Sequence, residues 1–395
     1  MKEWTNWSGS LRFTPSNFHK PADEAELADI VRKCYRTGKS YRLAAAGHSS
    51  TPLVKSTDTL INLDRMKGIV RHDNKTATLK AGMTVQESNL ALQKLGLALF
   101  NTGDVDVQTL AGAISTGTHG SGKKLPNLAS VLTGVKLIDY RGEIIEFNDE
   151  KDPDVMRAMR VSLGTLGVFS EITVKVVPLF KLRRIEICTD TDTCLYHFND
   201  LAQENRNVDF YWYPRSDETK IRILNEPGQG TTHFDFLHRR VEDVEDYVGL
   251  VLPKKRELKF DEMEYALPEE TGLHCFREIR QRIKERHRKS VAWRVLYRCI
   301  SSDDNYISPH YGRASVSISL HHNAGLPFDD YFNDIEPVFR YYGGRPHWAK
   351  KHNMSAGDLA PLYPEWTSFH QIRKKLDPEN LLLNEYLKKL LLQND

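Results

Sequence analysis

Hydrophobic residues in the first hundred positions recur with two spacings, which predict helices and short strands in alternation. Apolar residues at positions 27, 30, 31 and 34 fall on one helix face, so we expect an amphipathic helix over residues 24–34. A second helix is predicted from Thr84 to Leu95, and Gly96 is suited to end it. Apolar runs bounded by turn residues predict strands over residues 40–43, 60–63, 68–70 and 77–82. This order indicates a small α+β unit.

Both patterns continue along the rest of the chain. Residues 131–139 and 143–147 predict a hairpin, and residues 154–160 predict a short helix. The alternating stretch from Phe169 to Pro178 predicts a strand that closes a domain. Beyond it the pattern predicts strands and charged helices in alternation, with strands over residues 209–214 and 315–321 and helices over residues 270–288 and 329–341.

The loop over residues 44–51 combines four small residues with one histidine. Three alanines and Gly47 carry no side chains that would keep a ligand away from the backbone, so consecutive N–H groups could form a nest for a diphosphate or another anion. His48 would then stand over that ligand. The alternative is a strand end that runs into a turn with an incidental histidine.

Two further glycine-rich loops follow. Residues 106–122 hold glycines at 112, 117, 120 and 122 with hydroxyl residues between them, which predicts a flexible polar loop rich in donors. The order of these glycines fits neither a P-loop nor a Rossmann fingerprint, so the choice is between a nucleotide site of another architecture and an ordinary surface loop. The third loop, residues 163–168, leads directly into the strand that begins at Phe169.

Composition and charge limit the kinds of partner. A chain of 395 residues suggests two domains of about 150 to 200 residues each. The 55 basic residues almost balance the 53 acidic ones, which argues against a nucleic-acid or acidic-membrane binder and favours a small-molecule partner. Five scattered cysteines support neither a disulfide framework nor a zinc site, and we expect no metal. Without a signal region or a long apolar stretch, we expect a soluble, cytoplasmic protein.

The three loops, in this order and spacing, resemble those of FAD-dependent oxidoreductases of the vanillyl-alcohol-oxidase type, in the sugar-1,4-lactone and alditol oxidase branch. His347-Trp348-Ala349-Lys350 resembles a signature of the lactone oxidases, and residues 376–387 resemble their terminal segment. The resemblance implies an α+β fold with a two-subdomain FAD-binding domain of the PCMH type over residues 1–178. It further implies an α+β cap with a large antiparallel sheet over residues 179–353, and a C-terminal segment over residues 354–395 that returns to the FAD-binding domain.

The resemblance also implies the cofactor and the catalytic residues. FAD would be bound covalently through His48, Ser121 would hydrogen-bond the reacting hydroxyl, and Arg298 and Lys350 would stabilise negative charge. Lys350 could instead act as a base if it is buried. Without the resemblance, Arg298 could be half of a structural ion pair, Lys350 a solvated lysine, and His119 and His347 ordinary histidines. The residues expected to contact FAD are Ala45, Ala46, Gly47, His48, Ser49, Ser50, Thr116, Gly117, Thr118, Gly120, Ser121, Gly122, Gly164, Gly167, Val168, His347 and Asn384.

One position departs from the resembling family. Relatives carry Glu-x-Arg where this chain has Leu296, Tyr297 and Arg298, so the arginine is retained and the glutamate is lost. A lost carboxylate removes hydrogen bonds worth about 1.5 to 3 kcal/mol each, and leucine makes that wall of the substrate pocket apolar. Ser319 and His321 share a strand face by the period of two and are further pocket candidates.

The implied reaction is oxidation of a CH–OH group of a sugar lactone, polyol or related hydroxylated substrate, with hydride transfer to flavin N5. Either O₂ or another acceptor could reoxidise the flavin. Two alternatives stay open: a flavoprotein fold kept as a binding module after loss of catalysis, and an oxidase of a larger glycosylated substrate. Only Leu296 favours the binding module, whereas the joint presence of His48, Ser121, Arg298 and Lys350 favours an enzyme.

Overall fold

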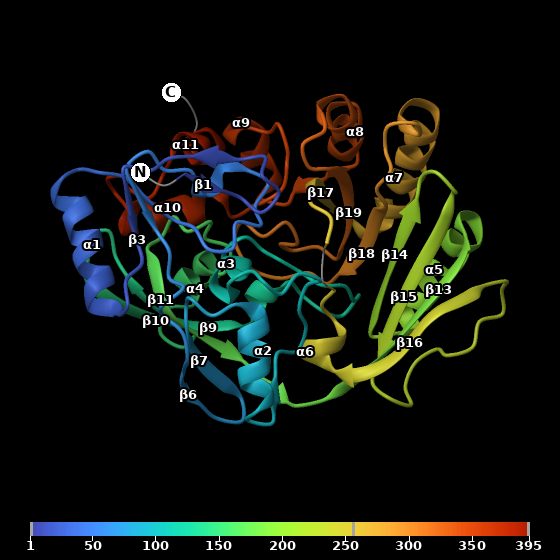
Figure 1. Cartoon of the computed structure of the whole chain (residues 1–395), viewed down its shortest axis with the longest axis horizontal. Helices are drawn as coiled ribbons and strands as arrows, with labels where there is room; N and C mark the ends of the chain where they lie inside the picture. Colours follow the sequence, from blue (N-terminus) through green and yellow to red (C-terminus); the bar gives the residue numbers. More distant parts are fainter. Residues whose placement is uncertain (1–2, 255–256, 393–395) are drawn as a thin grey trace.

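The computed structural model describes residues 3–254 and 257–392, which form two parts around two main sheets (Figure 1). The first part holds a five-stranded antiparallel sheet in the order β10-β9-β11-β7-β6 and a parallel three-stranded sheet in the order β3-β5-β4. The loop over residues 44–51 leaves the end of β4, so the parallel sheet positions it. The strands of this part are β1 Trp4–Thr5, β2 Arg12–Phe13, β3 Asn17–His19, β4 Tyr41–Leu43, β5 Thr59–Ile61, β6 Ile69–His72, β7 Thr76–Lys80, β8 Leu97–Ala98, β9 Leu132–Ile138, β10 Ile144–Asn148, β11 Val168–Lys175 and β12 Val177–Pro178.

The second part is built on an eight-stranded antiparallel sheet in the order β16-β13-β15-β14-β18-β19-β17-β20. This sheet confirms the expected cap with a large antiparallel sheet. We call it the cap sheet. Its strands are β13 Lys181–Asp190, β14 Asn207–Tyr213, β15 Glu218–Asn225, β16 Arg239–Tyr247, β17 Phe260–Pro268, β18 Val295–Ile300, β19 Ser315–Asn323 and β20 Arg345–Pro346. The helices of the whole chain are α1 Glu24–Arg36, α2 Val85–Gln93, α3 Leu110–Ser115, α4 Pro153–Met159, α5 Thr191–Glu204, α6 Val248–Val251, α7 Glu269–Arg282, α8 Asp329–Tyr341, α9 Ala356–Leu359, α10 Trp366–Leu376 and α11 Glu385–Leu391.

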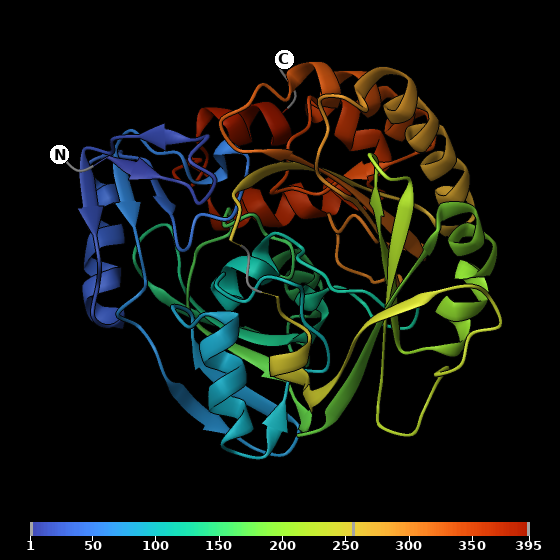
Figure 2. The ribbon, with the colours of Figure 1, turned by 45° about the vertical axis from the view of Figure 1, so that its right-hand side comes forward.

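The two faces of the cap sheet have different tasks. Helices α5 and α7 cover the outer face (Figures 1 and 2), where the Tyr297 ring stacks on Phe210 with centroids 4.9 Å apart and meets Phe198 edge-on at 5.1 Å. Because side chains alternate along a strand, the neighbours of Tyr297, Leu296 and Arg298, point to the opposite, inner face. That face looks toward the first part of the chain.

The C-terminal segment packs back onto the first part. Helix α10 contacts α4, and α11 contacts the short 3₁₀ turn Pro52–Val54 that follows the loop over residues 44–51. The backbone N–H of Tyr41 donates to the carbonyl of Leu381 at 3.0 Å. These contacts agree with a returning segment, while the domain boundaries themselves stay a prediction.

Most predicted elements are present with small shifts at their ends, and one expectation was wrong. The predicted helix over residues 329–341 is α8 with the same bounds, and α7 begins one residue early and ends in a π-helical turn, Ile283–His287. Residues 106–122, in contrast, are not a loop throughout, because α3 lies inside them. The glycine-rich sequence led us to expect a loop where there is a helix. This helix is capped by the Thr109 hydroxyl and buries Leu110 and Ile114.

No helix among the residues that the structure describes is both long and apolar enough to cross a membrane.

Candidate active site

A cavity of about 450 Å³ lies between the loops of the first part and the inner face of the cap sheet. From the first part, residues 42–49, 103–119 and 162–167 supply lining residues, and from the second part strands β17, β18 and β19 and residues 347–350 do so. Loops far apart in the sequence therefore share one site with the cap wall.

The small-residue loop lines this cavity along most of its length. Ala45, Ala46, Gly47, His48 and Ser49 all line it. Gly47 adopts a φ of +71°, where an L-residue is strained, and a Cβ there would lie 3.1 Å from the Trp4 ring. The N–H of Trp7 donates to the Gly47 carbonyl at 2.8 Å, so the N-terminal strand segment holds the loop in place.

The second loop reaches the cavity through α3 and the residues just after it. Thr116, Thr118 and His119 line the cavity, as do Gly112 and Ser115 of the helix. The helix therefore brings small and hydroxyl-bearing side chains to the cavity. It does so with a rigid element where the sequence suggested a flexible one.

The third loop is fixed by a buried arginine that the sequence analysis overlooked. From β4, Arg42 donates to the carbonyls of Leu163 and Gly164 at 2.7 Å each, to that of Leu53 at 2.9 Å and to that of Leu382 at 2.6 Å. Burial lowers the pKa of Arg42 to about 10, which still leaves the guanidinium charged at neutral pH. Gly164 and Gly167 line the cavity beside it.

The inner face of the cap sheet forms a wall of the cavity. Alternate residues of each strand point to this face, and they are both charged and apolar. Leu296 and Arg298 of β18, Glu262 and Glu264 of β17, and His321 of β19 all line the cavity. Strand β19 lies between β18 and β17, so Leu296 is paired with Ser319, and Ser319 with Glu264. The predicted common face of positions 296 and 298 is confirmed.

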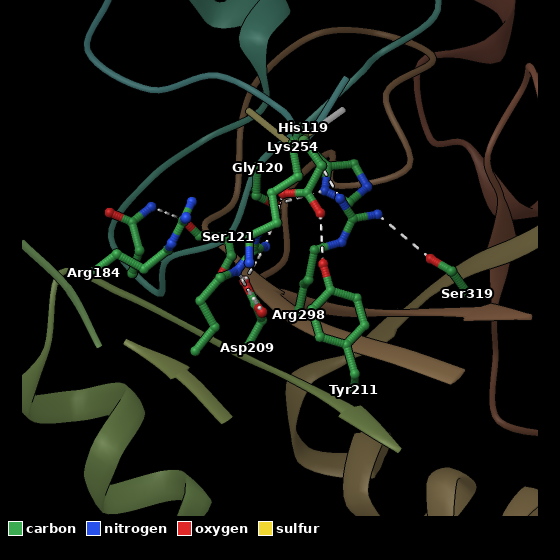
Figure 3. A network of polar contacts seen from close by, with 12 residues as sticks. His119, Gly120, Ser121, Arg184, Asp209, Tyr211, Lys254, Arg298 and Ser319 are labelled. Carbon is green, nitrogen blue, oxygen red and sulfur yellow. Dashed lines mark hydrogen bonds and ion pairs between the residues drawn. The ribbon is translucent and has the colours of Figure 1, made fainter. Parts of the chain in front are cut away.

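Each cation of this wall is held by its own carboxylate. Arg298 donates from Nη2 to Glu264 Oε2 at 2.9 Å and from Nη1 to the His119 carbonyl at 3.2 Å, and Figure 3 shows it between His119 and Ser319. Lys350 Nζ forms a short ion pair with Glu262 Oε2. Both residues were expected to stabilise negative charge, and a structural ion pair was the alternative for Arg298. The structure shows each of them in an ion pair at the cavity wall.

The two carboxylates differ in their electrostatic environment. Burial alone would raise the pKa of Glu264, but Arg298 and His119 outweigh it and hold that pKa well below its ordinary value. His119 contributes through its Nε2, which lies 2.6 Å from Glu264 Oε1. Burial raises the pKa of Glu262, and its partner Lys350 only partly opposes this.

Two histidines of the cavity are neutral at physiological pH. Burial and the nearby charge of Lys350 lower the pKa of His48 to about 4, and the ring stacks on Trp7 with centroids 4.8 Å apart. Burial lowers the pKa of His347 to about 3, although Glu264 opposes the shift. His347 accepts the Ala349 N–H at Nδ1, 3.2 Å away.

Ser121 does not lie where its expected catalytic role requires. It does not line the cavity, and its buried hydroxyl donates to the Val208 carbonyl on β14 at 2.5 Å. The next residue, Gly122, donates its N–H to the Cys299 carbonyl at 2.7 Å. This half of the second loop docks the first part onto the cap sheet, because its glycines allow close backbone contact: a Cβ on Gly122 would lie 2.7 Å from the carbonyl oxygen of Arg206, the residue before β14.

Several other expected site residues also lie outside the cavity lining. Ser319 is buried and donates to Glu264 Oε2 at 2.6 Å, so its hydroxyl is engaged within the wall. Asn384 caps α11 and donates to the carbonyls of Pro52 and Lys55 at 2.8 Å, which fixes the C-terminal segment against the loop that follows β4. Five more residues were expected to contact the cofactor but do not line the cavity: Ser50, Gly117, Gly120, Gly122 and Val168.

Glu262 and Glu264 are the most important cavity residues that the sequence analysis did not single out. The signal was present, because three acidic residues, Asp261, Glu262 and Glu264, interrupt an otherwise apolar run over residues 260–268, and the last two lie two positions apart. The period of two puts both on one face of a strand, and paired acidic residues on a buried face are uncommon unless they have partners.

The cavity fits FAD in its shape and in its unused donors. The small side chains around Gly47, α3 and Gly164 leave room for an extended ligand beside the backbone. The hydroxyl of Ser162 and the Nε of Arg298 are buried without a hydrogen-bond partner among the residues that the structure describes, and both residues line the cavity. Buried polar groups are normally hydrogen-bonded, so these donors point to a polar ligand.

Two family matches cover the first part of the chain and the part that contains the cap sheet, respectively. Residues 15–148 match the family described as an FAD binding domain, and residues 230–390 match the family D-arabinono-1,4-lactone oxidase. The first match covers the small-residue loop and the second loop, and the second covers β17, β18, β19 and Lys350.

Curated relatives align over almost their whole length. An L-gulono-1,4-lactone dehydrogenase of Mycobacterium tuberculosis is 29% identical, and the alignment covers 98% of this chain and 99% of the relative. An L-gulonolactone oxidase of Mus musculus is 27% identical, with 98% of each chain covered.

Solved structures share the fold at low sequence identity. A cholesterol oxidase from B. sterolicum superposes with a TM-score of 0.85 at 15% identity, covering 98% of this chain and 96% of that one. A chitooligosaccharide oxidase superposes with a TM-score of 0.80 at 16% identity, covering 96% and 93%. These likenesses establish the fold, in agreement with the α+β architecture expected from the sequence.

Proposed function

Because the chain belongs to the FAD-linked oxidoreductases of the vanillyl-alcohol-oxidase type, in the branch of the sugar-1,4-lactone oxidases and dehydrogenases, we propose that it oxidises a CH–OH group of a sugar lactone or a related hydroxylated molecule. The observation that carries this proposal is the shared cavity. A small-residue nest with His48 faces a cap wall that holds Arg298 and Lys350. The names of the relatives support a lactone as substrate and give no support to a non-redox binding module.

FAD, when bound, supplies the hydride acceptor for this reaction. The chain's own residues bind the cofactor, orient the substrate and stabilise developing negative charge. Ala45, Ala46 and Gly47 would hold the cofactor at one end of the cavity, and the unpartnered Nε of Arg298 would donate to an oxygen of the ligand. The charged pair of Lys350 and Glu262 places a cation beside the substrate space, where preorganised positive charge stabilises a developing oxyanion. Neutral His347 adds a polar ring to the same wall.

Three finer parts belong to this proposal. His48 carries the flavin covalently, because it stands in the small-residue loop with a neutral ring and lines the cavity. The reduced cofactor passes its electrons either to O₂ or to another acceptor. The protein acts in the cytoplasm on a small molecule.

The test is anaerobic titration of the purified holoenzyme with L-gulono-1,4-lactone, D-arabinono-1,4-lactone and xylitol while the visible flavin absorption is followed. We expect a lactone to bleach the flavin. A yellow protein that none of a broad panel of lactones and polyols bleaches would contradict the proposed activity. Reoxidation by air or by an added dye then distinguishes the two kinds of acceptor.

A further inference from the structure

The cap wall presents both hydrogen-bonding and apolar side chains to the cavity. Glu262 and Lys350 line the cavity at the β17 side, and Leu296 lines it at the β18 side, with β19 between them. Leu296 is 4% exposed and belongs to the buried apolar residues of the chain. A ligand in this cavity therefore meets the Glu262–Lys350 ion pair beside β17, and both Arg298 and the hydrocarbon of Leu296 on β18.

Of the two carboxylates of β17 that line the cavity, Glu264 has both oxygens engaged. Its Oε1 faces His119 Nε2 at 2.6 Å, and its Oε2 accepts from Arg298 at 2.9 Å and from Ser319 at 2.6 Å. These three donors come from a loop, from β18 and from β19. Glu264 thus organises the wall and is poorly placed to accept a further hydrogen bond from a ligand.

Glu262 is different, because among the described residues only its Oε2 accepts a hydrogen bond. Its Oε2 is paired with Lys350 Nζ, while Oε1 lies 3.6 Å from His321 Nε2, beyond hydrogen-bond distance. Among the described residues, no donor reaches Oε1 within hydrogen-bond distance. A buried carboxylate oxygen in this position needs a donor to offset its lost hydration.

We propose that Glu262 accepts a hydrogen bond from a substrate hydroxyl and thereby selects sugar lactones that place a hydroxyl against Glu262 and a C–H group against Leu296. This inference rests on the proposed function and specifies its substrate class. Open-chain alditols fit less well, because a hydroxyl on every carbon would place one against the leucine without a partner.

The ionisation of Glu262 supports this role. Burial raises its pKa, so the carboxylate loses its charge at a higher pH than an exposed glutamate would. The groups that face it are Lys350, His321, Glu264 and Arg298, of which the two cations favour the charged form and Glu264 opposes it. Since only the ionised form accepts a hydrogen bond at both oxygens, lactone binding should weaken as the pH falls through this raised pKa.

The experiment measures lactone binding to the dithionite-reduced holoenzyme by calorimetry, because the reduced enzyme can bind a lactone without oxidising it. The ligands are L-gulono-1,4-lactone and deoxy analogues that each lack one hydroxyl. For Glu262→Gln we expect binding of the parent lactone to weaken about 10- to 100-fold, as loss of a charged hydrogen bond implies. One deoxy analogue should bind wild type and variant equally, because it lacks the hydroxyl that Glu262 holds.

Glu269→Gln is the matched control, because Glu269 also pairs with a lysine, Lys123 at 2.6 Å, but lies outside the cavity lining. It should leave the affinities unchanged. Equal weakening for every lactone, or no weakening, in Glu262→Gln would overturn the inference. If that variant does not fold, the wild type alone tests the inference. Its affinity for the parent lactone must decrease as the pH is lowered, while its affinity for one deoxy analogue must not change with pH. If the wild-type protein binds lactones with this pH dependence but its flavin is not reduced by them, the proposed function is refuted and the role of Glu262 is still supported.

Discussion

His48 shows how the surroundings of one side chain prepare it for covalent chemistry. Its ring is stacked on Trp7, and burial together with Lys350 lowers its pKa to about 4. A pKa lowered in the folded protein means that the ring is neutral above about pH 5, so that a nitrogen lone pair is available for attachment to the flavin. A protonated ring could not make that bond.

We therefore predict that acid-precipitated wild-type protein retains its yellow colour, and that His48→Asn releases its flavin into the supernatant. Attachment of FAD to the apoprotein should have the same rate from about pH 6 to pH 8, since the ring is neutral throughout that interval. His233→Asn, at an exposed loop histidine, is the control. Full release of the flavin from intact wild type would contradict the covalent bond.

Lys350 is the second residue whose surroundings determine its effect. It is held against Glu262 at the cavity wall, so its removal also leaves a buried carboxylate without its cation. We predict that Lys350→Met slows flavin reduction by roughly 10² or more, as loss of a preorganised charge commonly does, while FAD stays bound. Rapid-mixing measurement of flavin reduction provides the comparison.

Lys351→Met is suited as the control for this prediction, because Lys351 lies next in the chain but outside the cavity lining, with its ammonium over the Phe328 ring at 4.7 Å. We expect a normal rate for it. If Lys350→Met reduced the flavin as fast as wild type, the ion pair with Glu262 would be purely structural.

At the level of elements, strand β18 determines what the substrate meets. Its alternation sends Tyr297 to the aromatic core under α5 and α7, and sends Leu296 and Arg298 to the cavity. A substrate hydroxyl placed against Leu296 would have no acceptor, which costs roughly 1 to 3 kcal/mol. The strand thus presents an arginine for recognition and a leucine for exclusion.

We predict poor turnover of xylitol and sorbitol by the wild type, and a shift toward both in Leu296→Glu. The measurement is kcat/KM over a panel of alditols and lactones, with Leu296→Met as the apolar control of similar volume. Efficient oxidation of xylitol by wild type, unchanged in Leu296→Glu, would show that this strand position does not govern substrate choice.

At the level of the whole molecule, Arg42 joins segments that are distant in sequence around the cavity. Its guanidinium donates to carbonyls at residues 53, 163, 164 and 382, so it connects β4, the third glycine loop and the C-terminal segment. A lysine keeps the charge but cannot reach four acceptors with one planar group. The unmet carbonyls would then be buried.

We predict that Arg42→Lys lowers the free energy of unfolding by about 3 to 5 kcal/mol and lowers the FAD content of the purified protein. Chemical unfolding and the ratio of flavin to protein absorption measure the two effects. Arg36→Lys, at an exposed position in the last turn of α1, should change neither. An unaffected Arg42→Lys protein would mean that the three segments hold together without this residue.

Much of the fold followed from local pattern. The spacing of apolar residues is a property of neighbouring positions, and it was enough to predict α8 with its bounds and to place Leu296 and Arg298 on one face. The loops near Gly47 and Gly164 could be recognised because small residues are needed wherever backbone approaches a ligand. Helix α3 was missed, because its glycine and serine have low helix propensity, whereas the Thr109 cap and the burial of Leu110 and Ile114 stabilise it.

The sequence by itself thus determined the α+β elements, the faces of the strands and the small-residue loops, whereas tertiary structure alone decided which side chains meet. His119 and Glu264 are 145 residues apart, yet they lie 2.6 Å from each other. Ser121 was assigned to the reaction, but its hydroxyl is turned to the Val208 carbonyl. The period of two predicts to which face of a sheet a side chain points, but it does not predict which strand lies next to it. In this sheet, β19 lies between β18 and β17. The ion pair of Arg298 with Glu264 crosses β19, whereas Lys350 reaches Glu262 from the segment that follows β20, the other neighbour of β17. Charges buried on one sheet face must find their partners on whichever segments pack next to them.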